Sequence, residues 1–251
     1  MTLTKYGRKE WVTATVVALL LLVCCAALAV LTDYLLAGIA LGLLVLVVWL
    51  AFVAFFRDPA RRIAEGEEVL VSPADGVVRD CELIPNASCG YPELSELFEG
   101  KDMFRIGIFL SVLDVHVNRA PCKMTVRFSV HKDGHYHDAR DPRAAAENES
   151  HLVGGVGEIS GRTFPVAVKQ ISGAIARRIV CPVKPGAHFE KGYCYGMIKF
   201  GSRTELYLPV KRNFEPAVNV GDRVFGGETV IARYHETEEE QPAGEGVGGM
   251  A

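Results

Sequence analysis

Residues 11–31 read WVTATVVALLLLVCCAALAVL and residues 34–56 read YLLAGIALGLLVLVVWLAFVAFF, with only Thr32 and Asp33 between them. Neither run contains a charged residue. An apolar helix of about 20 residues is long enough to cross the hydrocarbon core of a bilayer. The sequence therefore predicts a transmembrane helical hairpin, which forms a membrane anchor over residues 1–62.

A signal peptide followed by a buried core helix is the main alternative to this hairpin. No small-residue cleavage site follows the first run, and the second run is too long for a core helix. Cationic residues flank both ends of the hairpin: Lys5, Arg8, Lys9, Arg57, Arg61 and Arg62. Because such flanks stay on the inner side of a membrane, we expect a cytoplasmic domain held at the cell membrane. A lipid substrate would suit this anchor.

The sequence of residues 63–236 is typical of a β-rich domain. The tail that follows, residues 237–251, is rich in Glu and Gly and is expected to be disordered. Within residues 63–236, short β-type runs alternate with Gly, Pro and Asn. The predicted strands are 68–72, 76–81, 104–110, 124–131, 164–171, 197–200, 204–209 and 229–233. Residues 140–149 are expected to be helical or irregular, and 173–179 are ambiguous. The predicted class is α+β and mostly β, with a barrel-like or sandwich-like catalytic domain.

Charge and cysteine content exclude several classes of protein. The formal net charge is −3, so no overall basic field points to nucleic acid. The seven cysteines form no CxxC pair and no Cys/His spacing of a structural zinc site. The odd count argues against a disulfide framework and suits a reducing compartment.

One dipeptide, Gly201-Ser202, could carry unusual chemistry. A Gly-Ser pair after an apolar strand is most often an ordinary turn. The Ser202 hydroxyl could, however, attack the carbonyl of Gly201, which has no side chain to crowd the attack. Elimination across the resulting ester would turn Ser202 into a pyruvoyl group, whose ketone can form a Schiff base with an amine and act as an electron sink during decarboxylation.

Two further residues are candidates for acid–base chemistry. His116 follows the apolar run 106–110, where a general acid or base would be presented, although many such histidines are structural. Asp75 stands before Gly76 in an ordinary turn pair, and its functional role would be to orient a catalytic histidine.

A metal site and an anion site are weaker possibilities. His131, His135 and His137 lie near Asp133 and Asp138, but solvated loop histidines are commoner than metal ligands. Several scattered cations could meet an anionic head group: Lys169, Arg177, Arg178, Lys199 and Arg203.

Taken in order, these segments resemble those of the phosphatidylserine decarboxylases, especially the short prokaryotic form. The matching segments are FFRDP at 55–59, PADG at 73–76, FLS at 109–111, DVH at 114–116, NE at 148–149, GAIARRI at 173–179, GMIKFGSR at 196–203 and the closing stretch 221–230. Each segment alone is weak evidence for the family, but the ordered set covers nearly all of the chain after the anchor.

The resemblance implies a proenzyme that cuts itself between Gly201 and Ser202, so that residues 1–201 become a β chain and residues 202–251 an α chain. The two chains would remain together as a heterodimer, and whether these pairs form a higher homo-oligomer is left open. Ser202 would become the pyruvoyl cofactor, with neither a metal nor pyridoxal phosphate required. Asp75 would assist cleavage and His116 the decarboxylation of phosphatidylserine to phosphatidylethanolamine.

One position departs from the family pattern. The longer enzymes carry a second histidine three residues after the first, and it is tied to their self-processing, whereas this chain has Arg119 there. The base that activates Ser202 is therefore open: His116 could serve both steps, or a histidine of the 131–137 cluster could substitute.

Three other functions fit parts of the sequence. An archaetidylserine decarboxylase differs only in the lipid tails, which the sequence barely discriminates. A membrane-tethered zinc peptidase would use His135 and His137, but a second metal-ligand motif is missing from the sequence. A biotinyl- or lipoyl-like binding module would need an acceptor lysine in an MKM-like tripeptide, which the chain lacks.

Overall fold

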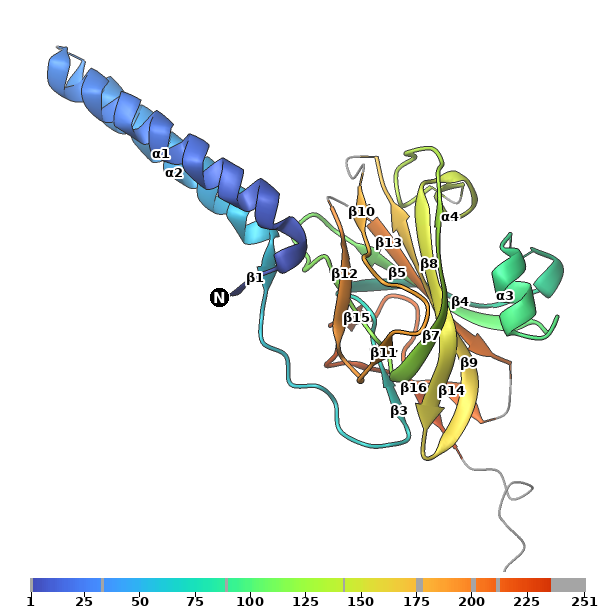
Figure 1. Cartoon of the computed structure of the whole chain (residues 1–251). Coiled ribbons are helices and arrows are strands. Elements are labelled where there is room, and N and C mark those ends of the chain that lie inside the picture. Colours follow the sequence, from blue (N-terminus) through green and yellow to red (C-terminus); the bar gives the residue numbers. More distant parts are fainter. Residues whose placement is uncertain are drawn as a thin grey trace, which may run out of the picture.

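The computed structural model describes residues 2–32, 34–88, 90–141, 143–174, 178–199, 202–210 and 213–235. Helices α1 (Arg8–Leu31) and α2 (Leu35–Phe55) lie side by side and project from one end of a β-rich domain (Figure 1). Both are long and apolar enough to cross a membrane. The predicted pair of apolar N-terminal helices is confirmed, and both ends of the hairpin lie at the β domain. That the hairpin spans a membrane stays a prediction.

Three antiparallel sheets make up the β domain among the described residues. The largest has eight strands in the order β11-β7-β8-β9-β13-β5-β4-β15. Its strands are β4 (Gly76–Ile84), β5 (Met103–Leu110), β7 (Lys123–Lys132), β8 (Ser150–Ile159), β9 (Arg162–Ser172), β11 (His188–Phe189), β13 (Ser202–Pro209) and β15 (Arg223–Val224).

Two three-stranded sheets pack against this large sheet. One has the order β10-β12-β6 and the other β14-β16-β3. Their strands are β3 (Val69–Val71), β6 (Val117–Arg119), β10 (Ile179–Val180), β12 (Cys194–Ile198), β14 (Phe214–Pro216) and β16 (Val230–Tyr234). A short pair, β1 (Thr2–Leu3) with β2 (Arg57–Asp58), joins the two ends of the hairpin.

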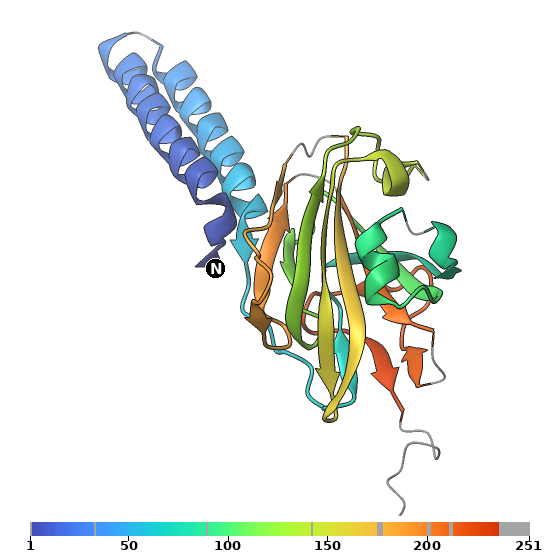
Figure 2. The same ribbon diagram turned by 45° about the vertical axis from the view of Figure 1, so that its right-hand side comes forward.

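The main core lies between the large sheet and the two smaller ones. Ile108 and Leu206 of the large sheet share one buried cluster with Tyr195 of β12 and Ile231 of β16. Helix α3 (Pro92–Leu97) lies on another side of the large sheet, away from the hairpin (Figure 2), and buries Leu94 in a second cluster. The predicted class, α+β and mostly β, is confirmed. The arrangement is a sandwich, because the described eight-stranded sheet ends in two open edges, β11 and β15.

Most predicted strands are present, but β8 was not predicted. Its sequence, SHLVGGVGEI, contains glycines that lower its β propensity. The glycines permit close packing: a Cβ on Gly155 would lie 2.1 Å from the carbonyl oxygen of Thr125. The predicted strand 197–200 instead runs over Cys194–Ile198. Among the described residues of 140–149, only α4 (Ala144–Glu147) is helical. The tail 237–251 lies outside the described residues.

The hairpin is joined to the β domain by specific contacts. The Thr4 amide donates to the Phe56 carbonyl over 2.8 Å, and the Tyr6 hydroxyl donates to the Cys194 carbonyl over 2.8 Å. Phe56 is fully buried and packs with Phe55 and Met197 of β12. The base of the hairpin therefore rests on the β10-β12-β6 sheet.

Candidate active site

Ser202 is the first residue of β13 and lies between two neighbouring strands. Its cross-strand partners are Leu110 of β5 and Ser172 of β9. The residue is fully buried, and its Oγ has no hydrogen-bond partner in the described part of the chain. An unpaired buried hydroxyl costs about 1–3 kcal/mol, so the fold keeps a poorly solvated oxygen at this position. Gly201, the other half of the predicted cleavage site, lies outside the described residues.

His116 is buried beside the base of the hairpin. Its Nδ1 lies 2.9 Å from the carbonyl oxygen of Asp114 and must donate to it, so the neutral ring presents Nε2 as a proton acceptor. Burial lowers the pKa of His116 to about 4. The ring packs against Phe55 at a centroid distance of 4.5 Å, and the His116 carbonyl accepts from the Ile198 amide over 3.1 Å. His116 thus stands next to the strand that leads into the 199–202 segment.

A buried asparagine ties the candidate segments together. Asn118 Nδ2 donates to Thr204 Oγ1 over 2.9 Å and to the Pro73 carbonyl over 3.4 Å. Its Oδ1 accepts from Gln170 Nε2 over 2.8 Å. The strand that starts at Ser202, the segment that carries His116 and the PADG turn are therefore linked through one side chain, which sequence reasoning missed because an Asn in a short strand carries no recognisable signal.

Asp75 lies at the same end of the sheet, because Gly76 begins β4 and Val77 pairs with Phe109 next to Leu110. Its carboxylate accepts from Arg61 Nη2 over 2.6 Å and from the Gly226 amide over 2.8 Å. Burial raises the pKa of Asp75, although the Gly226 amide and the positive charge of Arg61 oppose the shift. Asp75 thus holds the segment that follows the anchor, and its predicted role in cleavage stays a prediction.

Arg119, at the position where the resemblance to longer enzymes predicts a second histidine, makes structural contacts. Its Nη2 lies 2.6 Å from Asp58 Oδ1, and its Nη1 donates to the Gly192 carbonyl over 3.2 Å. The residue therefore links β2, at the membrane exit, to the turn before β12.

Among the histidines at 131–137, His131 lies far from Ser202, whereas His137 is closer, because the Asn148 side-chain amide donates to both the His137 carbonyl and the carbonyl of Ser172, the cross-strand partner of Ser202. His131 on β7 pairs with His151 on β8, and strand β9 still separates β8 from β13. Three strand intervals amount to about 14 Å, too far for direct proton transfer. His137 Nε2 lies 2.9 Å from Glu147 Oε2, and no group of three metal-ligating side chains gathers among the described residues.

The cations proposed for an anionic head group are mostly engaged elsewhere. Lys169 donates to the Ala145 carbonyl over 2.6 Å, and burial lowers its pKa. Lys199 lies 2.5 Å from Glu10, and Arg203 lies 2.6 Å from Asp80. Arg178 is exposed, and Arg177 lies outside the described residues.

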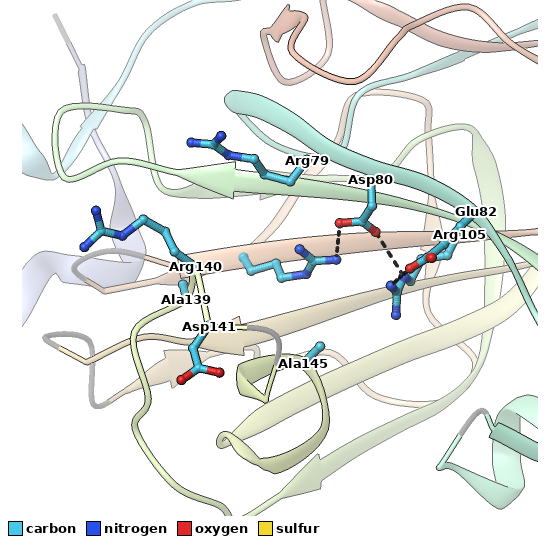
Figure 3. Close-up of a pocket in the computed structure, with 9 residues that line it drawn as sticks. Arg79, Asp80, Glu82, Arg105, Ala139, Arg140, Asp141 and Ala145 are labelled. Carbon is cyan, nitrogen blue, oxygen red and sulfur yellow. Dashed lines mark hydrogen bonds and ion pairs between the residues drawn. The ribbon is translucent and has the colours of Figure 1, made fainter.

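Two adjacent cavities open beside this end of the large sheet, and they share Arg79 and Arg140. One, of about 430 Å³, also contains Asp80, Glu82 and Arg105 (Figure 3). The other, of about 390 Å³, is lined by Ser111 and Gly173. These residues directly follow Leu110 and Ser172, the two cross-strand partners of Ser202.

Arg79 is one of the cations of these cavities that sequence reasoning missed. It is the extra residue of a β-bulge in β4, where Val78 pairs with Ile108 and Asp80 with Gly107. A bulge turns a side chain out of the regular alternation and often does so next to an active site. The exposed guanidinium stacks over Phe109 at 5.4 Å, and within the described residues no carboxylate forms an ion pair with it.

Comparison with known proteins identifies similar chains. A sequence model of the phosphatidylserine decarboxylase family matches residues 49–232. A phosphatidylserine decarboxylase proenzyme of Carboxydothermus hydrogenoformans is 45% identical over 194 residues, covering 77% of this chain and 84% of the relative. One from Cereibacter sphaeroides is 41% identical over 195 residues, covering 77% and 78%. A relative named for archaetidylserine, from Methanothermobacter thermautotrophicus, is 40% identical over 199 residues, covering 78% and 86%.

Proposed function

Because the chain belongs to the phosphatidylserine decarboxylase family, we propose that it breaks its own Gly201–Ser202 bond and uses a pyruvoyl group made from Ser202 to decarboxylate a serine phospholipid. The observation that carries this proposal is the Ser202 hydroxyl, which is fully buried and has no hydrogen-bond partner among the described residues. A nucleophile needs an uncommitted lone pair. The Ser172 hydroxyl is also buried and unpaired, but Ser172 follows Ile171, whereas Ser202 follows a glycine that has no side chain to crowd the attack.

The proposed self-cleavage has three chemical steps: an acyl shift, an elimination and a hydrolysis. Ser202 Oγ attacks the Gly201 carbonyl carbon, and the acyl group moves from nitrogen to oxygen to give an ester. Removal of the Ser202 Cα proton then expels the Gly201 carboxylate and leaves dehydroalanine. Water finally replaces its nitrogen, which departs as ammonia, and a ketone remains on the chain that begins at position 202. The pairing of β13 with β5 and β9 supports retention of both chains as a heterodimer.

The pyruvoyl ketone supplies the electron sink for the carbanion that forms when carbon dioxide leaves the bound serine head group. His116 moves the proton in this step: its Nδ1–H donates to the Asp114 carbonyl, so Nε2 is the atom that accepts a proton and then returns it. The low pKa of His116, about 4, favours the neutral ring at neutral pH.

The head-group phosphate is proposed to bind at Arg79, with Arg140 beside it. Arg140 is already chelated by Asp138 through contacts of 3.0 and 2.6 Å, so its charge is largely compensated. Arg79 forms no ion pair with a carboxylate of the described residues, and it lines the second cavity together with Leu110 and Gly173. A guanidinium that stacks on an aromatic ring is well suited to a phosphate.

The hairpin is proposed to span the cell membrane with the catalytic domain on the cytoplasmic face, because cations flank both hairpin ends. Archaetidylserine is the second candidate substrate, favoured by the relative named for it. The two lipids share the phosphoserine head group, so a test with ester-linked and ether-linked substrates in matched vesicles distinguishes them.

The test of self-cleavage is the intact mass of protein made in membranes. The wild type should yield two chains, one of residues 1–201 and one beginning with a pyruvoyl group at position 202. Ser202→Ala should stay in one piece and release no carbon dioxide from phosphatidylserine. Ser172→Ala is the matched control, because Ser172 is the cross-strand partner and has an equally buried, unpaired hydroxyl. A Ser202→Ala protein that still splits, or a wild type that is active while uncut, would refute the proposal.

A further inference from the structure

The turn between β5 and β6 carries two adjacent apolar side chains that face solvent in the structure. Val112 is 46% exposed and Leu113 is 83% exposed. Leu113 is as exposed as Leu36 near the far tip of the hairpin, which is 81% exposed. Two adjacent apolar side chains at the rim of a cavity indicate a contact surface rather than a scattered surface residue.

The turn is held in shape by its own polar groups. Asp114 Oδ2 accepts from both the amide and the hydroxyl of Ser111, each over 2.8 Å, and the Asp114 amide donates to the Ser111 carbonyl over 2.9 Å. Arg223 forms an ion pair with the other carboxylate oxygen of Asp114. The exposure of Leu113 is therefore built into an ordered turn.

The same turn is tied to the point where the hairpin ends. The Arg57 guanidinium donates to the Leu113 carbonyl and, over 3.1 Å, to the Ala54 carbonyl in the last turn of α2. His116, just after the turn, packs on Phe55 of the same helix. Leu113 therefore lies beside the base of the hairpin, at the level where the chain would leave the membrane.

We propose that Val112 and Leu113 insert into the bilayer that holds the hairpin and thereby seat the mouth of the substrate cavity on the lipid surface. The inference rests on the proposed membrane anchoring and extends it to the catalytic domain. Val112 lines the cavity that contains Arg79, and Leu110, at the start of the turn, is the cross-strand partner of Ser202. A lipid could thus pass its head group into the cavity while its tails stay beside the two side chains.

Photocrosslinking tests the occupant directly. The full-length protein, carrying p-benzoylphenylalanine in place of Leu113, is reconstituted in phosphatidylcholine vesicles and irradiated, and its intact mass is then measured by mass spectrometry. We expect a phospholipid adduct at this position. The control carries the same label in place of Leu83, which is 59% exposed but lies roughly 20 Å further along β4. A protein–protein adduct at position 113, no adduct, or equal lipid labelling at position 83 would overturn the proposal.

Kinetics provide a second readout that separates this inference from the proposed function. Leu113→Ser should raise the KM for phosphatidylserine in vesicles roughly tenfold, as expected when one leucine side chain loses its burial in lipid. Turnover of monomeric short-chain phosphatidylserine, and the extent of self-cleavage on a gel, should be unchanged. Equal loss on both substrates would overturn the membrane contact, whereas a wild type that never cleaves would refute only the proposed function.

Discussion

The ion pair between Glu10 and Lys199 joins the first membrane helix to the segment in front of the predicted cleavage site. Lys199 Nζ lies 2.5 Å from Glu10 Oε1, and the two side chains are 7% and 30% exposed. Lys199 directly follows the residue that ends β12, and its amide donates to the Arg178 carbonyl over 3.2 Å. We predict that this pair sets the rate at which the 199–202 segment reaches the geometry for cleavage.

The magnitude follows from the unequal burial of the two partners. Breaking a buried pair costs about 3–5 kcal/mol when the remaining charge has no access to water. Glu10→Gln leaves the buried Lys199 ammonium unpaired, but the pair is partly screened by water because Glu10 is 30% exposed. We therefore expect this variant to cost about 1.5 kcal/mol and to slow cleavage about tenfold. Lys199→Met should cost less, because the carboxylate that remains can be hydrated. The double variant should be faster than Glu10→Gln alone, since it leaves no unpaired buried charge.

The assay is synthesis of the proenzyme in a cell-free system with nanodiscs, with samples quenched over time and the two chains separated on a gel. First-order rate constants for the wild type, both single variants and the double variant form a double-mutant cycle. Glu99→Gln is the control, because it breaks an equally short pair with Lys101 in which both side chains are more than 70% exposed. Strictly additive single effects, or an equal slowing by Glu99→Gln, would refute the reasoning.

Three further predictions concern single residues. His116→Gln should abolish decarboxylation. Because the pKa of His116 in the folded wild type is about 4, the free energy of unfolding should fall by about 3 kcal/mol as the pH drops from about 6.5 to 4. Melting temperatures measured against pH should show a smaller fall in the variant. Gly76→Ala should lower the melting temperature of the detergent-solubilised protein, because the residue has φ +151° and a Cβ would lie 2.2 Å from the Phe109 carbonyl oxygen; a change within error would contradict this. Arg79→Gln should raise the KM for phosphatidylserine roughly tenfold with kcat retained, and Arg79→Lys should recover part of the loss; an unchanged KM in steady-state assays would remove Arg79 from the phosphate site.

Local patterns in the sequence predicted the parts of the fold that depend on local physics. The hairpin followed from two long uncharged runs, and strands such as β5 and β13 followed from their apolar residues and flanking turns. The glycine-rich β8 was missed because its stability comes from close packing on β7 and β9 rather than from its own residues. The segments around Ser202 and His116 were identified from their order along the chain. The contacts of Asn118, the bulge at Arg79 and the pair between Glu10 and Lys199 depend on register and long-range packing, which no local pattern encodes.

The segment FFRD, where the chain leaves the second helix, shows why the anchor is more than a tether. Phe55 packs on the His116 ring, and Phe56 is fully buried under the start of the chain. Arg57 holds the 111–114 turn through the Leu113 carbonyl, and Asp58 forms the ion pair with Arg119. Three of these four successive residues thus contact the segment 113–119, which carries His116. The distance and orientation of the site relative to the helix end are therefore fixed by short contacts rather than by a flexible linker. An enzyme that must take a head group from a lipid and return it to the same membrane gains from this arrangement, because the reactive position cannot drift away from the surface.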